Sequence, residues 1–327
     1  MIKNLILENR ILIIILIHIL FISCTKNKDS ENLPDSEITR IPDSEFERAL
    51  IALGHDSGPI DGIVLTKNIN TIKTLDVSGL FITDLTGIED FEKLEILNCS
   101  ENLLSTLDLS KNMVLKDLKC NDNKLSALKL DNPDLINLFC YDNQLTNIDF
   151  SSAINLKKLL GGGNLLSQLN LVNNSKLTEL VCFKSNVSSV TLSPSVNLES
   201  IVFTESNLTK IDLTSSTNLK LIDMTSNKLN ELNLSSNLMI ESISVHNNEL
   251  EILDLSNNLN LERLICYSNK LRKINLKNEN NNKIDGQGFD AKGNPNLTCV
   301  QVDNINSALE KWSNEIDNPE SFKTNCF

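Results

Sequence analysis

Apolar residues recur along this chain with a nested period that runs unbroken from about residue 94 to residue 281. The first apolar residues of successive units are 21 residues apart in seven of the eight intervals, and 20 apart in the other. A unit of this length cannot bury its own apolar side, so the units must stack into a solenoid. The residues that begin the units are Leu94, Leu115, Leu135, Leu156, Leu177, Leu198, Leu219, Ile240 and Leu261.

Each unit has two halves, with the patterns L-x-x-L-x-C-x-x-N and L-x-x-L-D-L-S-x-N. Apolar and polar positions alternate within each half, as at Leu97 and Cys99 and again at Leu107 and Leu109. This alternation is typical of short strands with one buried face, and no stretch keeps the 3.6-residue period of a helix. The pattern predicts a mainly β solenoid with short parallel strands on both faces and few helices.

Two positions of the unit form columns along the predicted solenoid. We expect the sixth residue, apolar in every unit but one, to point into the core. We expect the ninth residue, always Asn or Ser, to satisfy buried backbone groups and to bond to its neighbours in the column. The sixth residues are Cys99, Cys120, Cys140, Gly161, Cys182, Phe203, Met224, Val245 and Cys266, and the ninth are Asn102, Asn123, Asn143, Asn164, Ser185, Ser206, Asn227, Asn248 and Asn269.

With these motifs the chain resembles the leucine-rich-repeat family, and in particular the nested 21-residue class of exported bacterial proteins, especially those of Bacteroidota. The segment 72–88 is similar to the first repeat of internalins, and 41–47 and 293–299 resemble the terminal caps of that group. The resemblance implies a right-handed superhelix of about ten coils over 72–281. It also implies an exported recognition or adhesion protein, without indicating a ligand.

The first 23 residues are predicted to be a signal peptide, because a charged start precedes an apolar run that is too short for a comfortable membrane span. The run ends in Phe21-Ile22-Ser23-Cys24, which resembles the lipidation motif of lipoproteins, with Cys24 as the modified residue. The alternative is an ordinary signal peptide with an incidental cysteine. Residues 24–40 then form a polar, disordered tether, and we expect an outer-membrane lipoprotein that is exposed on the cell surface.

Both ends of a solenoid need covers, and helices are predicted at each. In the N-terminal cap (41–71), Ser44 and Glu47 fit a capping box, and Phe46, Leu50 and Leu53 share one helical face. In the C-terminal cap (282–327), Ile305, Leu309, Trp312 and Ile316 recur at helical spacing. Cys299 and Cys326 lie around this cap and are expected to form a disulfide in an oxidising envelope.

Composition and motifs argue against several classes of function. A formal net charge of −13 disfavours nucleic-acid binding. The repeat-spaced cysteines do not match zinc-site spacing, and the Asp-rich segment 55–62 lacks the ligand pattern of a calcium loop and is better explained as a turn. His55 and His246 have no partner in a nucleophile motif, and a flat or convex array offers no pocket for paired carboxylates. We therefore predict no enzyme, no metal and no cofactor.

The face formed by the first-half strands differs from the other face. Its outward positions cluster apolar side chains in four consecutive units, whereas the second face is polar throughout. We predict that a protein or glycan partner binds a monomer at Phe139, Tyr141, Leu160, Val181, Phe183 and Val202, with Gly162 leaving a shallow dip. The alternatives are that the patch packs against the same chain, that it is tolerated strand surface, or that the solenoid is a structural spacer without a ligand.

Overall fold

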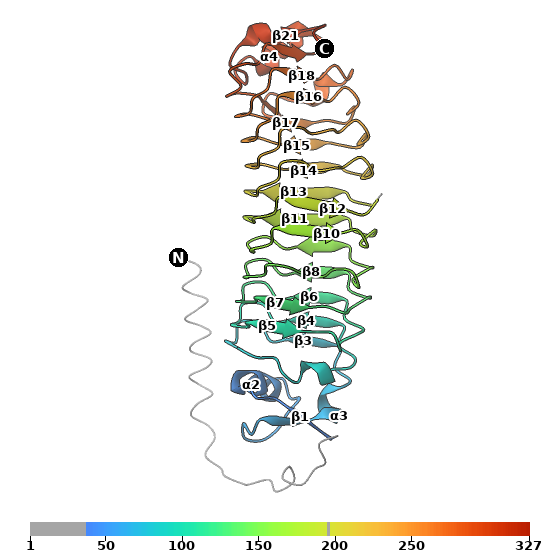
Figure 1. Cartoon of the computed structure of the whole chain (residues 1–327), viewed down its shortest axis with the longest axis vertical. Coiled ribbons are helices and arrows are strands. Elements are labelled where there is room, and N and C mark those ends of the chain that lie inside the picture. The colour runs from blue at the N-terminus through green and yellow to red at the C-terminus, as the bar shows by residue number, and fades with distance from the viewer. Residues whose placement is uncertain (1–36, 195–196) are drawn as a thin grey trace. The chain divides into compact units, whose positions relative to one another are not determined.

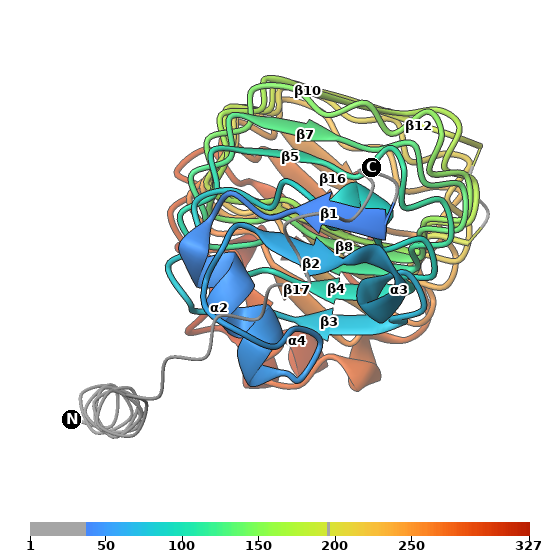
Figure 2. The same ribbon diagram turned by 90° about the horizontal axis from the view of Figure 1, so that it is seen from below.

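The computed structural model describes residues 37–194 and 197–327, of which 38–327 form one compact unit (Figure 1). This unit is a β solenoid, so the predicted fold class is confirmed. Its coils stack along one axis, and each coil runs along one face and returns along the other (Figure 2). The predicted signal peptide 1–23, the lipidation site Cys24 and most of the tether 24–40 lie outside the described residues. Over the described ranges, we find no helix that combines the length and the apolarity needed to cross a membrane.

The first-half strands pair in parallel into one 11-stranded sheet, which we call the first sheet. In every strand of three or more residues the second residue is buried, and the five-residue strands also bury their fourth residue, in agreement with the alternating pattern. The strands follow chain order, as β3 (Thr74–Asp76), β4 (Ile96–Asn98), β6 (Asp117–Lys119), β8 (Asn137–Phe139), β9 (Lys158–Leu160), β11 (Glu179–Phe183), β13 (Ser200–Thr204), β14 (Leu221–Asp223), β15 (Ser242–Ser244), β17 (Arg263–Ile265) and β19 (Phe289–Asp290).

The second face is less regular than predicted. Its strands form three separate groups, and the segments 147–150, 210–213 and 231–234 between the groups have no strand pairing. Ile148, Leu213 and Leu232 are nevertheless buried, because the apolar pattern sets the course of the chain even where the strands do not pair. The groups are β5 (Thr106–Asp108) with β7 (Ala127–Lys129), β10 (Gln168–Leu171) with β12 (Ser189–Leu192), and β16 (Ile252–Asp254), β18 (Lys273–Asn275), β20 (Cys299–Gln301) and β21 (Phe322–Lys323).

The core is built from the columns that the repeat predicts. The residues that begin the units are at most 1% exposed, and the whole sixth-residue column is buried, including Gly161. Burial raises the pKa of the Cys99 thiol to about 12 and that of Cys182 to about 11. These cysteines therefore stay protonated at neutral pH and pack as small hydrophobic side chains.

The ninth-residue column satisfies buried backbone groups, as predicted. Asn248, for example, accepts the N–H of Leu229 at 2.9 Å and donates its amide to the carbonyls of Met224 at 2.8 Å and Val245 at 3.1 Å. Mutual bonding along the column was a wrong expectation for the asparagines of the described chain, because their amides are used up by backbone groups of adjacent turns. Only Ser185 and Ser206, of the described members, bond to one another, with 2.8 Å between hydroxyl oxygens.

The N-terminal cap packs helix α2 (Ser44–Ala52) beside the antiparallel pair β1 (Ile38–Arg40) and β2 (Ile63–Leu65), followed by the short helices α3 (Thr66–Ile69) and η2 (Ile88–Asp90). The predicted capping box is wrong. Asp43 caps α2 instead, accepting the N–H groups of Glu45 and Phe46. Glu47 is buried and accepts the N–H groups of Asp61 and Gly62, which fastens the loop 55–62 as a turn.

Leu53 was also predicted wrongly, as part of the buried face of α2. Phe46 and Leu50 are fully buried, but Leu53 lies just beyond the helix and is 48% exposed. Helix α2 ends one residue earlier, and Gly54 follows with a φ of +77°, a conformation that glycine adopts without strain. The chain therefore turns away before Leu53 can reach the core.

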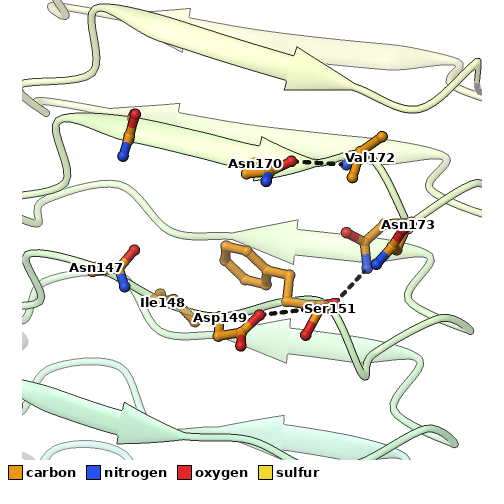
Figure 3. Close-up of a pocket in the computed structure, with 10 residues that line it drawn as sticks. Asn147, Ile148, Asp149, Ser151, Asn170, Val172 and Asn173 are labelled. Carbon is orange, nitrogen blue, oxygen red and sulfur yellow. Dashed lines mark hydrogen bonds between the residues drawn. The ribbon is translucent and has the colours of Figure 1, made fainter.

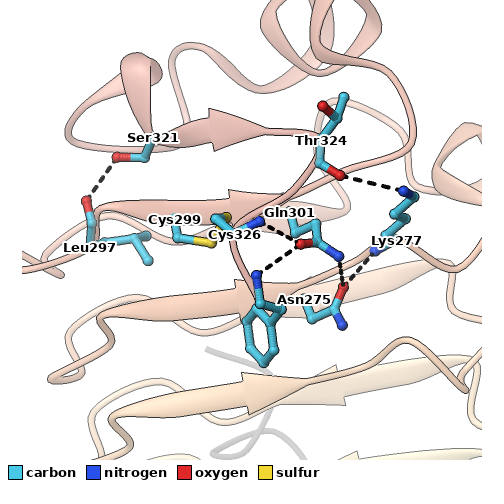
Figure 4. The surroundings of a disulfide bond; sticks show 9 residues. Asn275, Lys277, Leu297, Cys299, Gln301, Ser321, Thr324 and Cys326 are labelled. Carbon is cyan, nitrogen blue, oxygen red and sulfur yellow. Dashed lines mark hydrogen bonds between the residues drawn. A yellow bond between two sulfur atoms is a disulfide. The ribbon is translucent and has the colours of Figure 1, made fainter.

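The C-terminal cap contains η3 (Asn281–Lys283), helix α4 (Ile305–Trp312) and η4 (Pro319–Ser321). Trp312 is 1% exposed and stacks on Phe289 of the first sheet, with ring centroids 4.8 Å apart. Leu309 is 37% exposed, contrary to prediction, because Ala308 and Trp312 form the buried face of α4. The predicted disulfide joins Cys299 to Cys326 (Figure 4).

Candidate recognition face

The first sheet carries two outward rows of side chains along the solenoid axis. Row five contains the fifth residue of each unit, and row seven contains the seventh. Because the strands pair in register, the members of row five lie on neighbouring strands, and those of row seven follow two residues later in the same coils. Row five is Asn98, Lys119, Phe139, Leu160, Val181, Val202, Asp223, Ser244 and Ile265, and row seven is Ser100, Asn121, Tyr141, Gly162, Phe183, Thr204, Thr225, His246 and Tyr267.

The residues predicted to contact a partner form one continuous strip across β8, β9, β11 and β13. Leu160 pairs in register with Phe139 on one side and Val181 on the other, and the next strand adds Val202. All members are partly exposed. The structure thus brings these residues together, and their contact with a partner stays a prediction. We call this set the apolar strip: Phe139, Tyr141, Leu160, Val181, Phe183 and Val202.

Gly162 does not leave the dip that we expected. A Cβ atom at this position would lie 2.5 Å from Cδ1 and 2.6 Å from Cγ of Phe183, so the ring of Phe183 occupies the space above the glycine. The ring also lies near Tyr141, two coils earlier in the chain, with 6.3 Å between centroids and 45° between ring planes. The missing side chain at Gly162 therefore lets two aromatic rings meet across an intervening strand.

Replacing Gly162 with alanine is expected to push the Phe183 ring away from Tyr141 and to lower the free energy of unfolding by about 1–3 kcal/mol through overpacking. Nuclear Overhauser contacts between the two rings and urea unfolding would measure both effects. Gly161→Ala is the matched control, because its Cβ would come no closer than 3.8 Å to its nearest neighbour, Cys140 Sγ. Retention of the Tyr141–Phe183 contact in the Gly162 variant would contradict this account.

Charged and polar groups border the apolar strip. Lys158 and Glu179, the third residues of two neighbouring repeat units, form an ion pair at 2.9 Å. The ammonium group of Lys119 lies 5.9 Å from the centroid of Phe139. Burial raises the pKa of the Tyr141 hydroxyl, and the carboxylates of Asp122 and Asp142 in the adjoining turns add to the effect. Tyr141 therefore stays protonated at neutral pH and can donate a hydrogen bond from the edge of the strip.

A second aromatic pair on this face was not singled out from the sequence. His246 and Tyr267 of row seven stack with centroids 4.3 Å apart, and Nδ1 of His246 lies 3.2 Å from the hydroxyl of Thr225. Burial lowers the pKa of His246, against the opposing effect of the carboxylates of Asp223 and Asp290. Beside the pair, Ile265 is only 8% exposed, although its position in row five predicts an outward residue.

The second face is polar at the positions that match row five, as predicted, but Ile252 of β16 is 48% exposed and the face is not flat. A hollow of about 250 Å³ lies where the strand pairing is interrupted, and amide and carboxylate groups such as Asn147, Asp149 and Asn170 line it (Figure 3). A wider one of about 730 Å³ lies over the unpaired segments further along and includes Asp212, Glu231 and Asp254. The expectation that this array offers no pocket was wrong, because we assumed continuous strands on both faces.

Two carboxylates of these hollows, Asp149 and Asp212, are held as ionised hydrogen-bond acceptors. Backbone and side-chain hydrogen bonds from Ser151 lower the pKa of Asp149, and those from the Thr214 side chain and backbone lower the pKa of Asp212. General acid catalysis needs the opposite change, a carboxyl that keeps its proton near neutral pH. Within the described ranges, His, Cys, Asp and Glu side chains form no group of three or more that could hold a metal ion.

Comparison with known proteins places the chain in the leucine-rich-repeat fold. No protein-family model matches the chain, and no curated protein matches its sequence. Among solved structures it is similar to the functional domain of InlJ from Listeria monocytogenes, which includes a cysteine ladder, with 26% identity and a TM-score of 0.61. That match covers 81% of this chain and 67% of the InlJ chain.

Two further structures share the fold and were solved with partners. The plant peptide hormone receptor RGFR1, in complex with RGF2, is 22% identical with a TM-score of 0.57, over 73% of this chain and 41% of the receptor. The LRIM1/APL1C complex is 20% identical with a TM-score of 0.55, over 77% of this chain and 53% of the other.

Proposed function

We propose that this protein is a non-catalytic binding protein of the bacterial cell surface that recognises a partner protein through the apolar strip. Within this proposal, Cys24 carries a lipid that anchors the chain in the outer membrane of a Bacteroidota-type cell. The tether predicted at 24–40 ends where β1 begins at Ile38, and it carries a solenoid that spans 72–281, with caps at 38–71 and 282–327. The chain acts as a monomer in recognition or adhesion.

The observation that carries this proposal is the contrast between the two faces. Partly exposed apolar side chains occupy four consecutive strands of the first sheet in register, while carboxylate, amide and hydroxyl groups occupy the matching positions of the second face. A contiguous apolar patch with a polar border on one face of a soluble protein typically marks a contact surface. Aromatic residues such as Phe139, Tyr141 and Phe183 are favoured anchors at such contacts.

A protein ligand is favoured over a glycan, which is the competing ligand class. The complexes of RGFR1 with RGF2 and of LRIM1 with APL1C are examples of this fold with protein or peptide partners. The alternative function is that of an envelope spacer without a ligand. A spacer tolerates removal of whole repeats, so deletion of residues 135–218 separates the two, because recognition is lost with the strip.

The proposal predicts that Phe139→Asp/Phe183→Asp abolishes partner binding. Two charges placed in an apolar contact should weaken binding at least tenfold, which is the range of interface anchors. We would express residues 25–327, which retain the whole compact unit 38–327, in an oxidising host. Binding would be measured on surface-protein and glycan arrays.

Asn170→Asp/Asn233→Asp is the matched control. It adds the same charge on the second face, where Asp149 and Asp212 already occupy the equivalent positions of other coils. Each variant must first show the circular dichroism and melting temperature of the parent. Hits retained by the strip variant would refute the site, and a chain with no hits on either array would favour the spacer.

A further inference from the structure

Row five of the first sheet has a charge order that the apolar strip alone does not reveal. Across six neighbouring strands, from β6 to β14, one cationic residue is followed by four apolar residues and then by one anionic residue. The register pairs Lys119 with Phe139, and Val202 with Asp223, at the two ends of the strip. Five strand intervals of roughly 4.8 Å separate Lys119 from Asp223 by about 24 Å.

The two end charges differ from those of Lys158 and Glu179 beside the strip because neither of them forms a close ion pair with a described residue. In the described part of the chain, neither Lys119 nor Asp223 has an ion-pair partner within 4.0 Å. Lys119 lies over the ring of Phe139, and Asp223 accepts the N–H of Thr225 at 3.0 Å. By contrast, Lys158 and Glu179 beside the strip neutralise each other at 2.9 Å.

Other charged groups lie close to the ends. The register continues row five to Asp76, two strands before Lys119, and, against the opposing effect of burial, hydrogen bonds from Ser78 and Asn98 together with the charge of Lys119 lower the pKa of Asp76. Asp122 and Asp142 belong to the turns that follow row seven, and His246 lies beyond Asp223 on β15's following turn. Within row five itself, Lys119 and Asp223 are therefore the charges that a ligand on the strip would meet at its two ends.

The width of the strip restricts the shape of its ligand. Rows five and seven are two residues apart in each coil, which is roughly 6.6 Å of extended backbone. Polar groups border these rows on both sides, namely Lys158 and Glu179 at the third residue of the unit and Asp142 and Lys184 at the eighth. A single extended chain over row five meets one side chain on each strand of the strip, whereas a helix is roughly 10–12 Å wide and would also cover row seven.

We infer that the partner contributes an extended, mainly apolar chain segment that lies along the solenoid axis over row five. This segment carries an acidic residue against Lys119 and a basic residue against Asp223. At roughly 3.3 Å per residue, the two charges are about seven residues apart in the partner. The inference rests on the proposed function and adds the chemistry and length of the recognised segment.

The probe is a phage-displayed library of random dodecapeptides, selected on residues 25–327 and then depleted on the Phe139→Asp/Phe183→Asp variant. Selected peptides should be apolar and should carry one acidic and one basic residue about seven positions apart. The best peptide is then synthesised in three forms, with ends that are acidic and basic, both acidic, or both basic. Because an extended peptide can bind in either direction, these three forms test the end charges independently of orientation.

Single charge reversals supply the test on the protein side. The unaltered chain should bind the acidic–basic peptide best, by about two- to fivefold per end. Lys119→Glu should transfer the preference to the doubly basic peptide, and Asp223→Lys should transfer it to the doubly acidic one. Lys119→Gln/Asp223→Asn should show little preference, and its Asn side chain can still accept the N–H of Thr225.

The outcomes separate the inference from the function on which it rests. The inference would be overturned, and the proposed function left standing, by peptides that need the apolar strip but bind equally well whatever their end charges. Peptides that bind the unaltered chain best with two like end charges would have the same meaning. A selection that yields no peptide dependent on Phe139 and Phe183, despite a folded protein, would overturn both.

Discussion

Asn248→Ala is expected to lower the free energy of unfolding by about 3–5 kcal/mol, the largest effect of any single substitution discussed for this protein. Asn248 is 7% exposed, and its amide serves the carbonyls of Met224, Val245 and His246, while its oxygen accepts the N–H of Leu229. Alanine would leave the N–H of Leu229 without its acceptor and would remove one of the two donors to each carbonyl, which keep Asn227, Asn269 and the Ser226 N–H. Urea unfolding followed by far-ultraviolet circular dichroism measures the loss.

The controls for this prediction separate hydrogen bonding from simple truncation. Asn230→Ala removes the same atoms from an exposed residue of the preceding coil and should change stability by less than about 0.5 kcal/mol. Asn248→Asp keeps the acceptor but replaces the amide donor with a second acceptor facing carbonyl groups. It should therefore destabilise the protein at least as much as alanine does. A nearly neutral Asn248→Asp would show that the amide donor is dispensable.

Removing the disulfide by Cys299→Ala/Cys326→Ala is expected to destabilise the C-terminal cap by about 3–4 kcal/mol. The bond closes a loop with a sequence separation of 27, and the estimate follows from the chain entropy that such a loop removes from the unfolded state. Without it, the terminus is held by weaker contacts, such as the hydrogen bonds from the Cys326 and Phe327 N–H groups to Gln301 Oε1 (Figure 4) and the ammonium group of Lys273 5.6 Å from the centroid of Phe327.

Trp312 reports this change directly, because it is the single tryptophan and is packed between Phe289 and Phe322. Its fluorescence should respond to quenchers at a lower urea concentration in the variant than in the parent. Dithiothreitol should lower the urea concentration at which Trp312 of the parent becomes accessible to quenchers to the value found for the variant. It should leave the value for the variant unchanged, since the other described cysteines are buried free thiols. If reduction left the unfolding of the parent unaltered, the disulfide would have no stabilising role.

Much of the architecture could be predicted because the repeat imposes the same environment on every coil. A 21-residue period fixes which side chains point inward, so the leading leucines, the cysteine column and the asparagine column followed from spacing alone. The pairing of Cys299 with Cys326 followed because the other cysteines of the mature chain after Cys24 belong to the repeat. The membership of the apolar strip followed for the same reason, since residues 20 or 21 apart lie side by side.

The predictions that failed depended on contacts between segments with no fixed period. Asp43 rather than Ser44 caps α2, and Glu47 turns inward because the backbone of Asp61 and Gly62 needs an acceptor there. Leu53 and Leu309 fit helical spacing but lie where the helix ends or turns towards water. A local sequence pattern does not distinguish one capping residue from another, or a buried leucine from an exposed one, because tertiary contacts determine the outcome.

The sequence by itself determined the coil, its direction of stacking and the chemical character of each face, because one short pattern is repeated and each copy must bury the same positions. Only the tertiary structure decided how neighbouring coils adjust to one another. It placed the ring of Phe183 over Gly162, stacked His246 on Tyr267, and opened hollows where second-face strands do not pair. These features arise from side-chain packing across coils, which a single repeat does not encode.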